Sequence, residues 1–204
     1  MRATKSFIGF ALSLLMTIAV TSVQAATGIP TDQIKATVDK ALVVLKDPRF
    51  KSDGKLKERR AQLKQILFAR FDFFEMGKRS LGSEWRRRTP AEQEEFVQLF
   101  TDVLERAYAK TIESYTDEKI VYVGEKLDGS YADVSSKILT SKGQEYSIDY
   151  KVQLVGGEWK VYDVVVENIS MVNNFRSQFA SVLSKHGYDE LIRRLKNKAE
   201  AGTD

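Results

Sequence analysis

The sequence EYSIDYKVQLV, which spans Glu145 to Val155, decides the fold. Apolar and polar side chains alternate along it, which is typical of a β-strand with one buried face. Its apolar side is formed by Tyr146, Ile148, Tyr150, Val152 and Leu154. The segment therefore predicts a strand of a sheet that turns one face to a core.

Three neighbouring segments are also predicted to be strands: Lys119–Glu125, Tyr131–Thr140 and Glu158–Glu167. Short turns rich in glycine separate the four strands, at Asp128-Gly129, Ser141-Lys142-Gly143 and Gly156-Gly157. Such short connections only join antiparallel neighbours. We therefore expect a four-stranded antiparallel meander.

The segments before and after this meander carry apolar residues at helical spacing. Thr89-Pro90-Ala91-Glu92 combines a threonine cap, a proline in the first turn and a glutamate at the third position, and it predicts a helix to about Ser114. Further helices are expected at about 31–46, after Gly54, after Asp72, from Ser170 to Gly187 and from Tyr188 to Ala199. The prediction is an α+β fold, with N-terminal and C-terminal helices covering the sheet.

The first 25 residues are predicted to be a cleavable signal peptide. Arg2 and Lys5 precede the apolar run Phe7–Val20, and Val23-Gln24-Ala25 has the pattern of a cleavage site. We expect export to the periplasm and one α+β domain, with a helical lobe, over residues 26–204. Without Arg2 and Lys5 the net charge falls from +4 to +2, which does not favour nucleic-acid binding.

Few residues indicate chemistry. The chain has no cysteine, which excludes thiol catalysis, cysteine metal sites and a lipid anchor on cysteine. Its one histidine, His186, is expected at a helix end. Asp163 is either a catalytic acid or a structural carboxylate bonded to the backbone or to Arg176. The run Arg86–Arg88 is either a solvated loop or a contact for phosphates or an acidic partner.

Apolar side chains are in excess on the predicted sheet and helices. In the strand Glu158–Glu167 both faces are apolar, with Val161 and Val165 on one and Val164 and Val166 on the other. An antiparallel meander usually wets one face. The pattern therefore predicts a generous apolar interior, which is either a packed core or a pocket.

Residues about 60–185 resemble the MlaC family of periplasmic phospholipid-binding proteins, also described as toluene-tolerance proteins. The segments that carry the resemblance are Phe71-Asp72, Leu81-Gly82 with Trp85, Thr89-Pro90, Phe96–Tyr108, Trp159–Val164, Asn168–Val172 and Asn174–Phe179. Asn168-Ile169-Ser170-Met171 departs from the expected Gly-Val-Ser-Leu. This difference is small enough to leave the fold unaffected.

The resemblance implies lipid transport without chemistry. Such proteins carry phospholipid between an outer-membrane lipoprotein–porin complex and an inner-membrane ABC transporter with an MCE-domain protein, and so maintain outer-membrane lipid asymmetry. Acyl chains would lie in a hydrophobic pocket between helices and sheet, with the headgroup in water. We accordingly expect a monomer with phospholipid as cargo, no catalytic residue, no metal, no cofactor and no nucleic-acid partner.

Fifteen residues are predicted to contact the lipid, with plain core packing as the alternative for each. The expected sheet floor consists of Tyr146, Ile148, Tyr150 and Val152, extended by Val164 and Val166. The expected helical walls are Phe74, Leu81, Phe100, Leu104 and Tyr108. The expected movable lid is Met171, Val172, Phe175 and Phe179.

Three other functions stay open. One is an enzyme on a cone-shaped α+β scaffold, using Asp163 with Tyr150 on a hydrophobic substrate. Another is a carrier of different hydrophobic cargo, and the third is an adaptor that holds no ligand.

Overall fold

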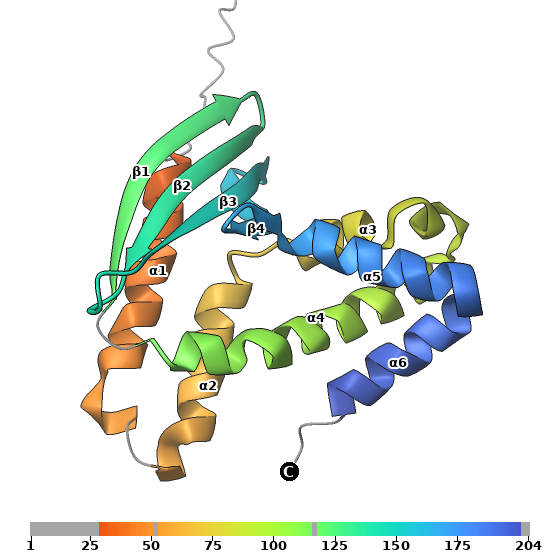
Figure 1. The fold of residues 1–204 in the computed structure, drawn as a ribbon, viewed down its shortest axis with the longest axis horizontal. Coiled ribbons are helices and arrows are strands. Elements are labelled where there is room, and N and C mark those ends of the chain that lie inside the picture. Colours follow the sequence, from red (N-terminus) through yellow and green to blue (C-terminus); the bar gives the residue numbers. More distant parts are fainter. Residues whose placement is uncertain (1–28, 51–52, 116–117, 201–204) are drawn as a thin grey trace, which may run out of the picture.

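The computed structural model describes residues 29–50, 53–115 and 118–200 (Figure 1). The predicted signal peptide lies outside these residues. The helices are α1 Pro30–Lys46, α2 Leu56–Phe68, α3 Phe73–Leu81, α4 Pro90–Glu113, α5 Met171–His186 and α6 Tyr188–Glu200. The strands are β1 Lys119–Asp128, β2 Tyr131–Leu139, β3 Glu145–Val155, β4 Glu158–Val166 and β5 Ile169–Ser170. Short 3₁₀ turns lie at Pro48–Phe50, Asp53–Lys55 and Gly82–Arg87.

The α+β class and the antiparallel sheet are confirmed, but the expected number of strands is wrong. The sheet has five strands in the order β1-β2-β3-β4-β5, because a short turn returns Ile169–Ser170 onto the end of β4. Both residues of that turn, Glu167 and Asn168, have positive φ angles, of 48° and 64°. Hairpin turns with positive φ angles usually contain glycine. Because neither residue here is glycine, the sequence does not indicate this turn.

Helix α1 packs on the sheet through a core of its own (Figure 1). Ile34 joins a buried cluster with residues of β2, β3 and β4: Ala132, Val134, Val152, Trp159, Val161 and Val164. The side chain of Gln33 accepts a hydrogen bond from the Trp159 backbone N–H at 3.0 Å and another from Arg70 Nη1 at 2.8 Å. Arg70 Nη1 also donates to the Trp159 carbonyl at 2.9 Å. These bonds fix α1 and the segment that follows α2 to β4.

Helices α3, α4, α5 and α6 form a separate helical lobe. Its centre is a group of phenylalanine rings that contact one another with centroids 5.2–5.9 Å apart: Phe96, Phe100, Phe175 and Phe179. Stacked and edge-to-face contacts of this kind stabilise a core beyond the apolar area that they bury. The lobe therefore has a close-packed core that is distinct from the sheet core.

Asp163 is a structural carboxylate, as one of the two alternatives predicted. It is buried, and its carboxylate accepts hydrogen bonds from Ser170 Oγ at 2.5 Å and from the Val172 backbone N–H at 3.0 Å. Ser170 Oγ in turn accepts from the Asn173 N–H and caps α5. A carboxylate at a helix N-terminus is stabilised by the free N–H groups there. Asp163 therefore connects β4 to the start of α5.

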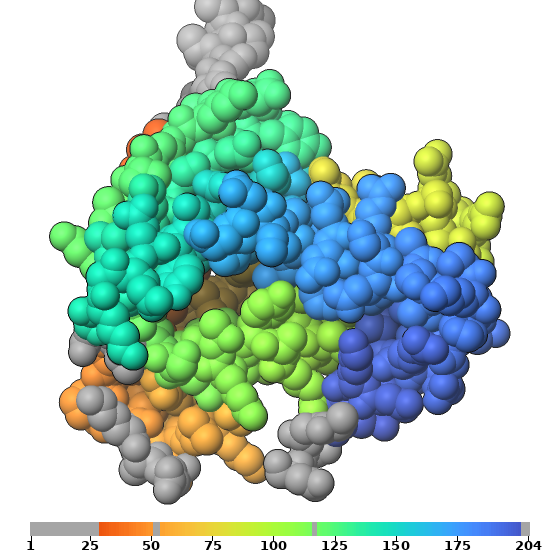
Figure 2. Space-filling model, viewed as in Figure 1, coloured from red at the N-terminus to blue at the C-terminus, as the bar shows by residue number. Residues whose placement is uncertain are grey.

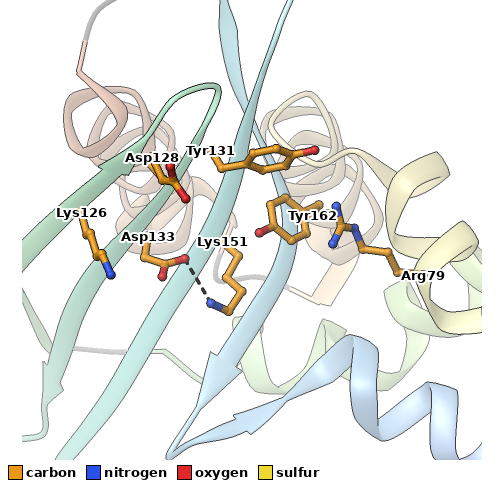
Figure 3. A pocket seen from close by; sticks show the side chains of 8 residues that line it. Arg79, Lys126, Asp128, Tyr131, Asp133, Lys151 and Tyr162 are labelled. Atoms are coloured by element: carbon orange, nitrogen blue, oxygen red, sulfur yellow. Dashed lines mark hydrogen bonds and ion pairs between the residues drawn. The ribbon is translucent and has the colours of Figure 1, made fainter.

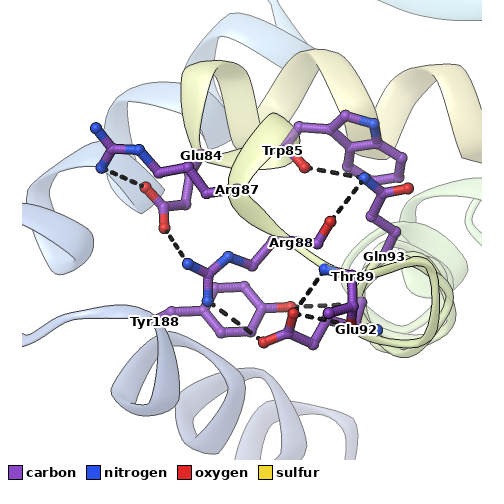
Figure 4. A network of polar contacts seen from close by, with 8 residues as sticks. All are labelled: Glu84, Trp85, Arg87, Arg88, Thr89, Glu92, Gln93 and Tyr188. Atoms are coloured by element: carbon purple, nitrogen blue, oxygen red, sulfur yellow. Dashed lines mark hydrogen bonds and ion pairs between the residues drawn. The ribbon is translucent and has the colours of Figure 1, made fainter.

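The arginine run divides into a structural residue and exposed ones. Arg88 forms ion pairs with Glu84 at 2.8 Å and with Glu92 at 3.3 Å, and its guanidinium lies 4.4 Å from the Tyr188 ring centroid (Figure 4). The Tyr188 hydroxyl donates to the Glu92 carbonyl at 3.0 Å, and burial raises the pKa of Tyr188 to about 12. Arg88 therefore ties α6 to the capped start of α4, whereas Arg86 and Arg87 remain exposed.

Replacing Asp163 by asparagine should destabilise the protein by about 1–3 kcal/mol, because the buried N–H of Val172 loses a charged acceptor. Urea unfolding measures the change, and Asp149→Asn, on neighbouring β3, is the control. Equal stability of the two variants would show that Asp163 does not hold α5 to the sheet.

Candidate functional site

An apolar cavity of about 380 Å³ lies between the sheet and helices α1, α2 and α4. Figure 2 shows a hollow between the sheet, the region of β4 and β5, and α4, with α2 visible inside. The volume falls in the range of about 300–1,000 Å³ that is typical of small-molecule sites. The position of the cavity follows from the fold, because the sheet core and the helical lobe lie on different sides of it.

The sheet wall of the cavity is built by side chains that share one face. Ile120, Ile138, Ile148, Tyr150, Val164 and Val166 line it. The register explains this grouping, because Ile120 pairs with Ile138, Ile148 with Val166, and Tyr150 with Val164. Directly opposed residues of an antiparallel pair point to the same face of the sheet.

The helical walls come mostly from α1, α2 and α4, with Phe73 and Met76 of α3 and Met171 of α5 beside them. Neither α1 nor α2 carries any of the predicted lipid contacts. Helix α1 contributes Val38, Ala41, Leu42 and Leu45, and α2 contributes Leu63, Leu67 and Phe68. Helix α4 adds Leu104, Tyr108 and Ile112, whose spacing of four places them on one face. Adjacent apolar residues at 41/42 in α1 and at 67/68 in α2 make the apolar face of each helix wider than a single stripe. This extra width could have indicated from the sequence that both helices line the cavity.

Seven of the fifteen predicted lipid contacts line this cavity. They are Leu104, Tyr108, Ile148, Tyr150, Val164, Val166 and Met171. The structure therefore brings together part of the predicted sheet floor, one helical wall and one residue of the predicted lid.

The other eight residues lie elsewhere. Five of them belong to the core of the helical lobe: Leu81, Phe100, Val172, Phe175 and Phe179. Val152 is fully buried in the core between α1 and the sheet. Phe74 is 54% exposed, with its ring edge-on to Trp85, and Tyr146 is 40% exposed. A pattern of apolar residues identifies a buried face but does not say whether core or cavity adjoins it.

Charged groups occur in one part of the cavity lining. Arg60 and Lys64 of α2 face Glu105 and Glu113 of α4, and they form the ion pairs Arg60–Glu113 at 2.5 Å and Lys64–Glu105 at 2.6 Å. The phenols of Tyr108 and Tyr150 stay protonated, because burial raises the pKa of both. The lining can therefore shelter an apolar molecule and meet a polar group at the α2–α4 side.

A second pocket, of about 350 Å³, is polar (Figure 3). Lys151 forms an ion pair with Asp133 there at 3.1 Å, and the Arg79 guanidinium lies 4.2 Å from the Tyr162 ring centroid. Lys151 follows Tyr150 in β3, so the two side chains point to opposite faces of the sheet. This pocket therefore marks the wet face, and its charges do not suit an apolar ligand.

Neither pocket presents a metal centre. Within residues 29–50, 53–115 and 118–200, no three histidine, cysteine, aspartate or glutamate side chains are grouped so that they could bind a metal ion. Across the same ranges, no helix is long and apolar enough to cross a membrane.

Replacing Ile148 by tryptophan should fill the cavity without unfolding the protein, because the larger ring enters existing space. Titration with a fluorescent apolar probe such as N-phenylnaphthylamine should show binding weakened by about tenfold or more, the equivalent of at least about 1.4 kcal/mol. Val43→Trp is the control, since Val43 is 71% exposed on α1. Unchanged probe binding by a folded Ile148→Trp protein would exclude the cavity as the binding site.

Known proteins resemble the chain in sequence. A relative from Haemophilus influenzae, the intermembrane phospholipid transport system binding protein MlaC, is 29% identical over 128 residues, which is 60% of each chain. A toluene tolerance protein from Pseudomonas putida is 32% identical over 105 residues, or 51% of this chain and 49% of the relative. The chain thus matches less than two thirds of the length of these curated relatives.

A solved structure and a family profile cover more of the chain. The structure is a phospholipid-binding protein from Ralstonia solanacearum in complex with a phospholipid. It is 25% identical, has a TM-score of 0.77, and the match covers 85% of this chain and 98% of that one. The profile of the MlaC protein family matches residues 35–197. This match extends over most of the sequence, and the chain therefore belongs to the MlaC family.

Proposed function

We propose that this protein is a phospholipid carrier that holds acyl chains in the cavity between the sheet and helices α1, α2 and α4. The observation that carries the proposal is the lining itself, which is apolar except at the α2–α4 side. The Ralstonia relative, described as bound to a phospholipid, supports the same class of ligand.

The energetics of lipid transfer require such a cavity. Burying one methylene contributes about 0.8 kcal/mol, so two chains of about fifteen methylenes cost on the order of 24 kcal/mol to expose. A carrier must offset most of this cost and still release its cargo. Release then depends on a partner that changes the shape of the cavity, rather than on a chemical step.

The lipid contacts that we propose combine the predicted residues at the cavity with the walls that α1 and α2 add. The acyl chains lie against Ile148, Tyr150, Val164, Val166, Leu104, Tyr108 and Met171, with Leu42 of α1 and Leu67 of α2 facing them. The residues in the helical lobe act by supporting α4 and α5.

The proposed setting is the periplasm, after removal of residues 1–25. The mature monomer, residues 26–204, takes phospholipid between an outer-membrane lipoprotein–porin complex and an inner-membrane ABC transporter with an MCE-domain protein. The family resemblance supports this route, as does the name of the Haemophilus relative, which describes an intermembrane phospholipid transport system. Such transport would maintain outer-membrane lipid asymmetry.

The proposed function involves no catalysis. Asp163, the candidate acid, is buried and bonded to Ser170 and to the α5 backbone. Tyr150, its suggested partner, has a pKa raised by burial. The Asp163 carboxylate is thus engaged at the start of α5, and the Tyr150 phenol stays protonated at neutral pH.

Native mass spectrometry of protein purified without detergent tests the proposal. We expect adducts with phospholipid masses, which solvent extraction removes and which are depleted in Ile148→Trp but not in Val43→Trp. Adducts of other masses would indicate different cargo. A wild-type protein without any adduct, and unable to take up lipid from vesicles, would contradict the carrier function.

A further inference from the structure

The segment between β4 and α5 forms one edge of the opening of the cavity. Val166 at the end of β4 and Met171 at the start of α5 both line the cavity. Figure 2 shows the hollow directly beside the region of β4 and β5. Ile169 pairs with Val166, so the two side chains point to the same face of the sheet. We refer to residues 167–170, which connect these two parts of the lining, as the rim segment.

The rim segment is weakly packed. It pairs with β4 through two residue pairs, Val165 with Ser170 and Val166 with Ile169. Residues 166–169 are all exposed, and Ile169 is 64% exposed. A segment with few buried apolar contacts and exposed backbone hydrogen bonds opens at a small cost in free energy. The cores of the helical lobe and of the sheet are buried instead, and they do not open in this way.

The backbone of the rim segment is strained in the observed position. Glu167 and Asn168 have positive φ angles, of 48° and 64°. This left-handed conformation is unfavourable for a residue with a Cβ atom, although asparagine tolerates it better than glutamate does. The family resemblance predicts glycine at position 168, which would carry no such strain. Detachment of the segment releases the strain and offsets part of the cost of the hydrogen bonds that break.

Hydrogen bonds fix the two ends of the rim segment, and they differ in burial. At one end, Ser170 Oγ donates to the buried carboxylate of Asp163 at 2.5 Å. At the other end, the Glu167 N–H donates to the Ser147 carbonyl at 3.1 Å, and the Glu167 carboxylate accepts from the Ser147 N–H at 2.5 Å. Because Glu167 and Ser147 are both exposed, water competes for their hydrogen bonds. The segment therefore detaches more readily from Ser147 than from Asp163.

We propose that the rim segment is a gate, which swings away from Ser147 about a hinge at Ser170 and so opens the cavity to an acyl chain. The inference rests on the proposed function, since it concerns the entry and release of the same cargo. The movement lies before α5, whereas the lid expected from the sequence included Phe175 and Phe179, which are fixed in the helical lobe. The open form is a minor state, and a partner that binds it better shifts the equilibrium and releases the cargo.

A disulfide across the gate tests the proposal. The chain has no cysteine, so Ser147→Cys with Glu167→Cys creates a single possible bond. These positions come next to the pair Ile148–Val166 in the register of β3 and β4. Directly opposed residues of antiparallel strands have Cα atoms about 4.5–5.5 Å apart, which suits a disulfide. Binding of cis-parinaric acid, a fluorescent fatty acid, to delipidated mature protein is followed by stopped-flow fluorescence.

We expect the oxidised protein to bind and release the fatty acid about tenfold more slowly than wild type, or more slowly still, because the open state is no longer reached. The Kd should stay within about twofold of the wild-type value, since a gate limits the rates and not the bound state. Reduction of the disulfide should restore exchange to at least the wild-type rates.

The matched control is a disulfide on the wet face, at the other end of the sheet. Lys126 of β1 pairs directly with Asp133 of β2, and both line the polar pocket. Lys126→Cys with Asp133→Cys therefore adds the same kind of bond away from the rim segment. This control should exchange the fatty acid at wild-type rates in both redox states.

A second variant tests the gate without a disulfide. Glu167→Ala removes the carboxylate that accepts from the Ser147 N–H, so the gate opens more often. Both rates should rise by about two- to tenfold, in keeping with the modest net contribution of one hydrogen bond. Glu145→Ala, which removes the exposed partner of Lys137 from the same strand as Ser147, should leave both rates unchanged.

The outcomes separate the two proposals. Wild-type exchange rates in the oxidised cross-linked protein, or in Glu167→Ala, would overturn the gate while the carrier function stands. Should the cross-linked variant fail to fold, Glu167→Ala alone provides the measurement. Failure of wild-type protein to bind the fatty acid would instead overturn the carrier function.

Discussion

The structure depends on keeping an apolar cavity open. Apolar side chains around a space of about 380 Å³ forgo the dispersion contacts that a packed core would give them. The whole stability of a domain is about 5–15 kcal/mol. Such a space therefore persists only if its walls are fixed independently of one another or if another molecule fills it.

The walls are fixed independently, because each has its own core and its own anchors. Helix α1 shares a buried cluster with the sheet, α1 and α2 share another, and helices α3–α6 share a third. The connection between α2 and α3 pairs with β4, since the Val161 N–H donates to the Arg70 carbonyl and the Asp72 N–H to the Val161 carbonyl, both at 2.8 Å. Asp163 fixes α5 to the same strand. Strand β4 thus anchors α1, the connection between α2 and α3, and the start of α5.

The sequence predicts the architecture well where periodicity and turn chemistry agree. The alternation in Glu145–Val155 and the capping box at Thr89 both correspond to observed elements. Strand β5 could not be predicted, because its turn uses Glu167 and Asn168 in a conformation that favours glycine. The sequence analysis placed Ser170 at the cap of the following helix, and it did not predict that Ile169 and Ser170 also pair with β4.

The cavity could be predicted only in part, for a physical reason. Ile148 and Val152 are on the same face of the same strand, yet Ile148 lines the cavity and Val152 is packed beneath α1. Phe73 and Phe74 are adjacent phenylalanines, and only Phe73 reaches the cavity. Burial next to a core and burial next to a space produce the same hydrophobic pattern, so the position of the helices decides between them.

We propose that these walls hold an acyl chain. The sheet and the surrounding helices present aliphatic and aromatic groups, and the charges are confined to the α2–α4 side. The polar pocket lies on the other face of the sheet, so one face of the sheet lines the apolar cavity and the other is exposed to water. Binding of this kind needs no reactive group, only a space from which water is excluded.

The most direct test is an experimental structure of the protein purified without detergent. We expect continuous electron density for acyl chains between Tyr150 of β3 and Leu104 of α4. A structure in which side chains close this space, with no lipid density, would contradict it.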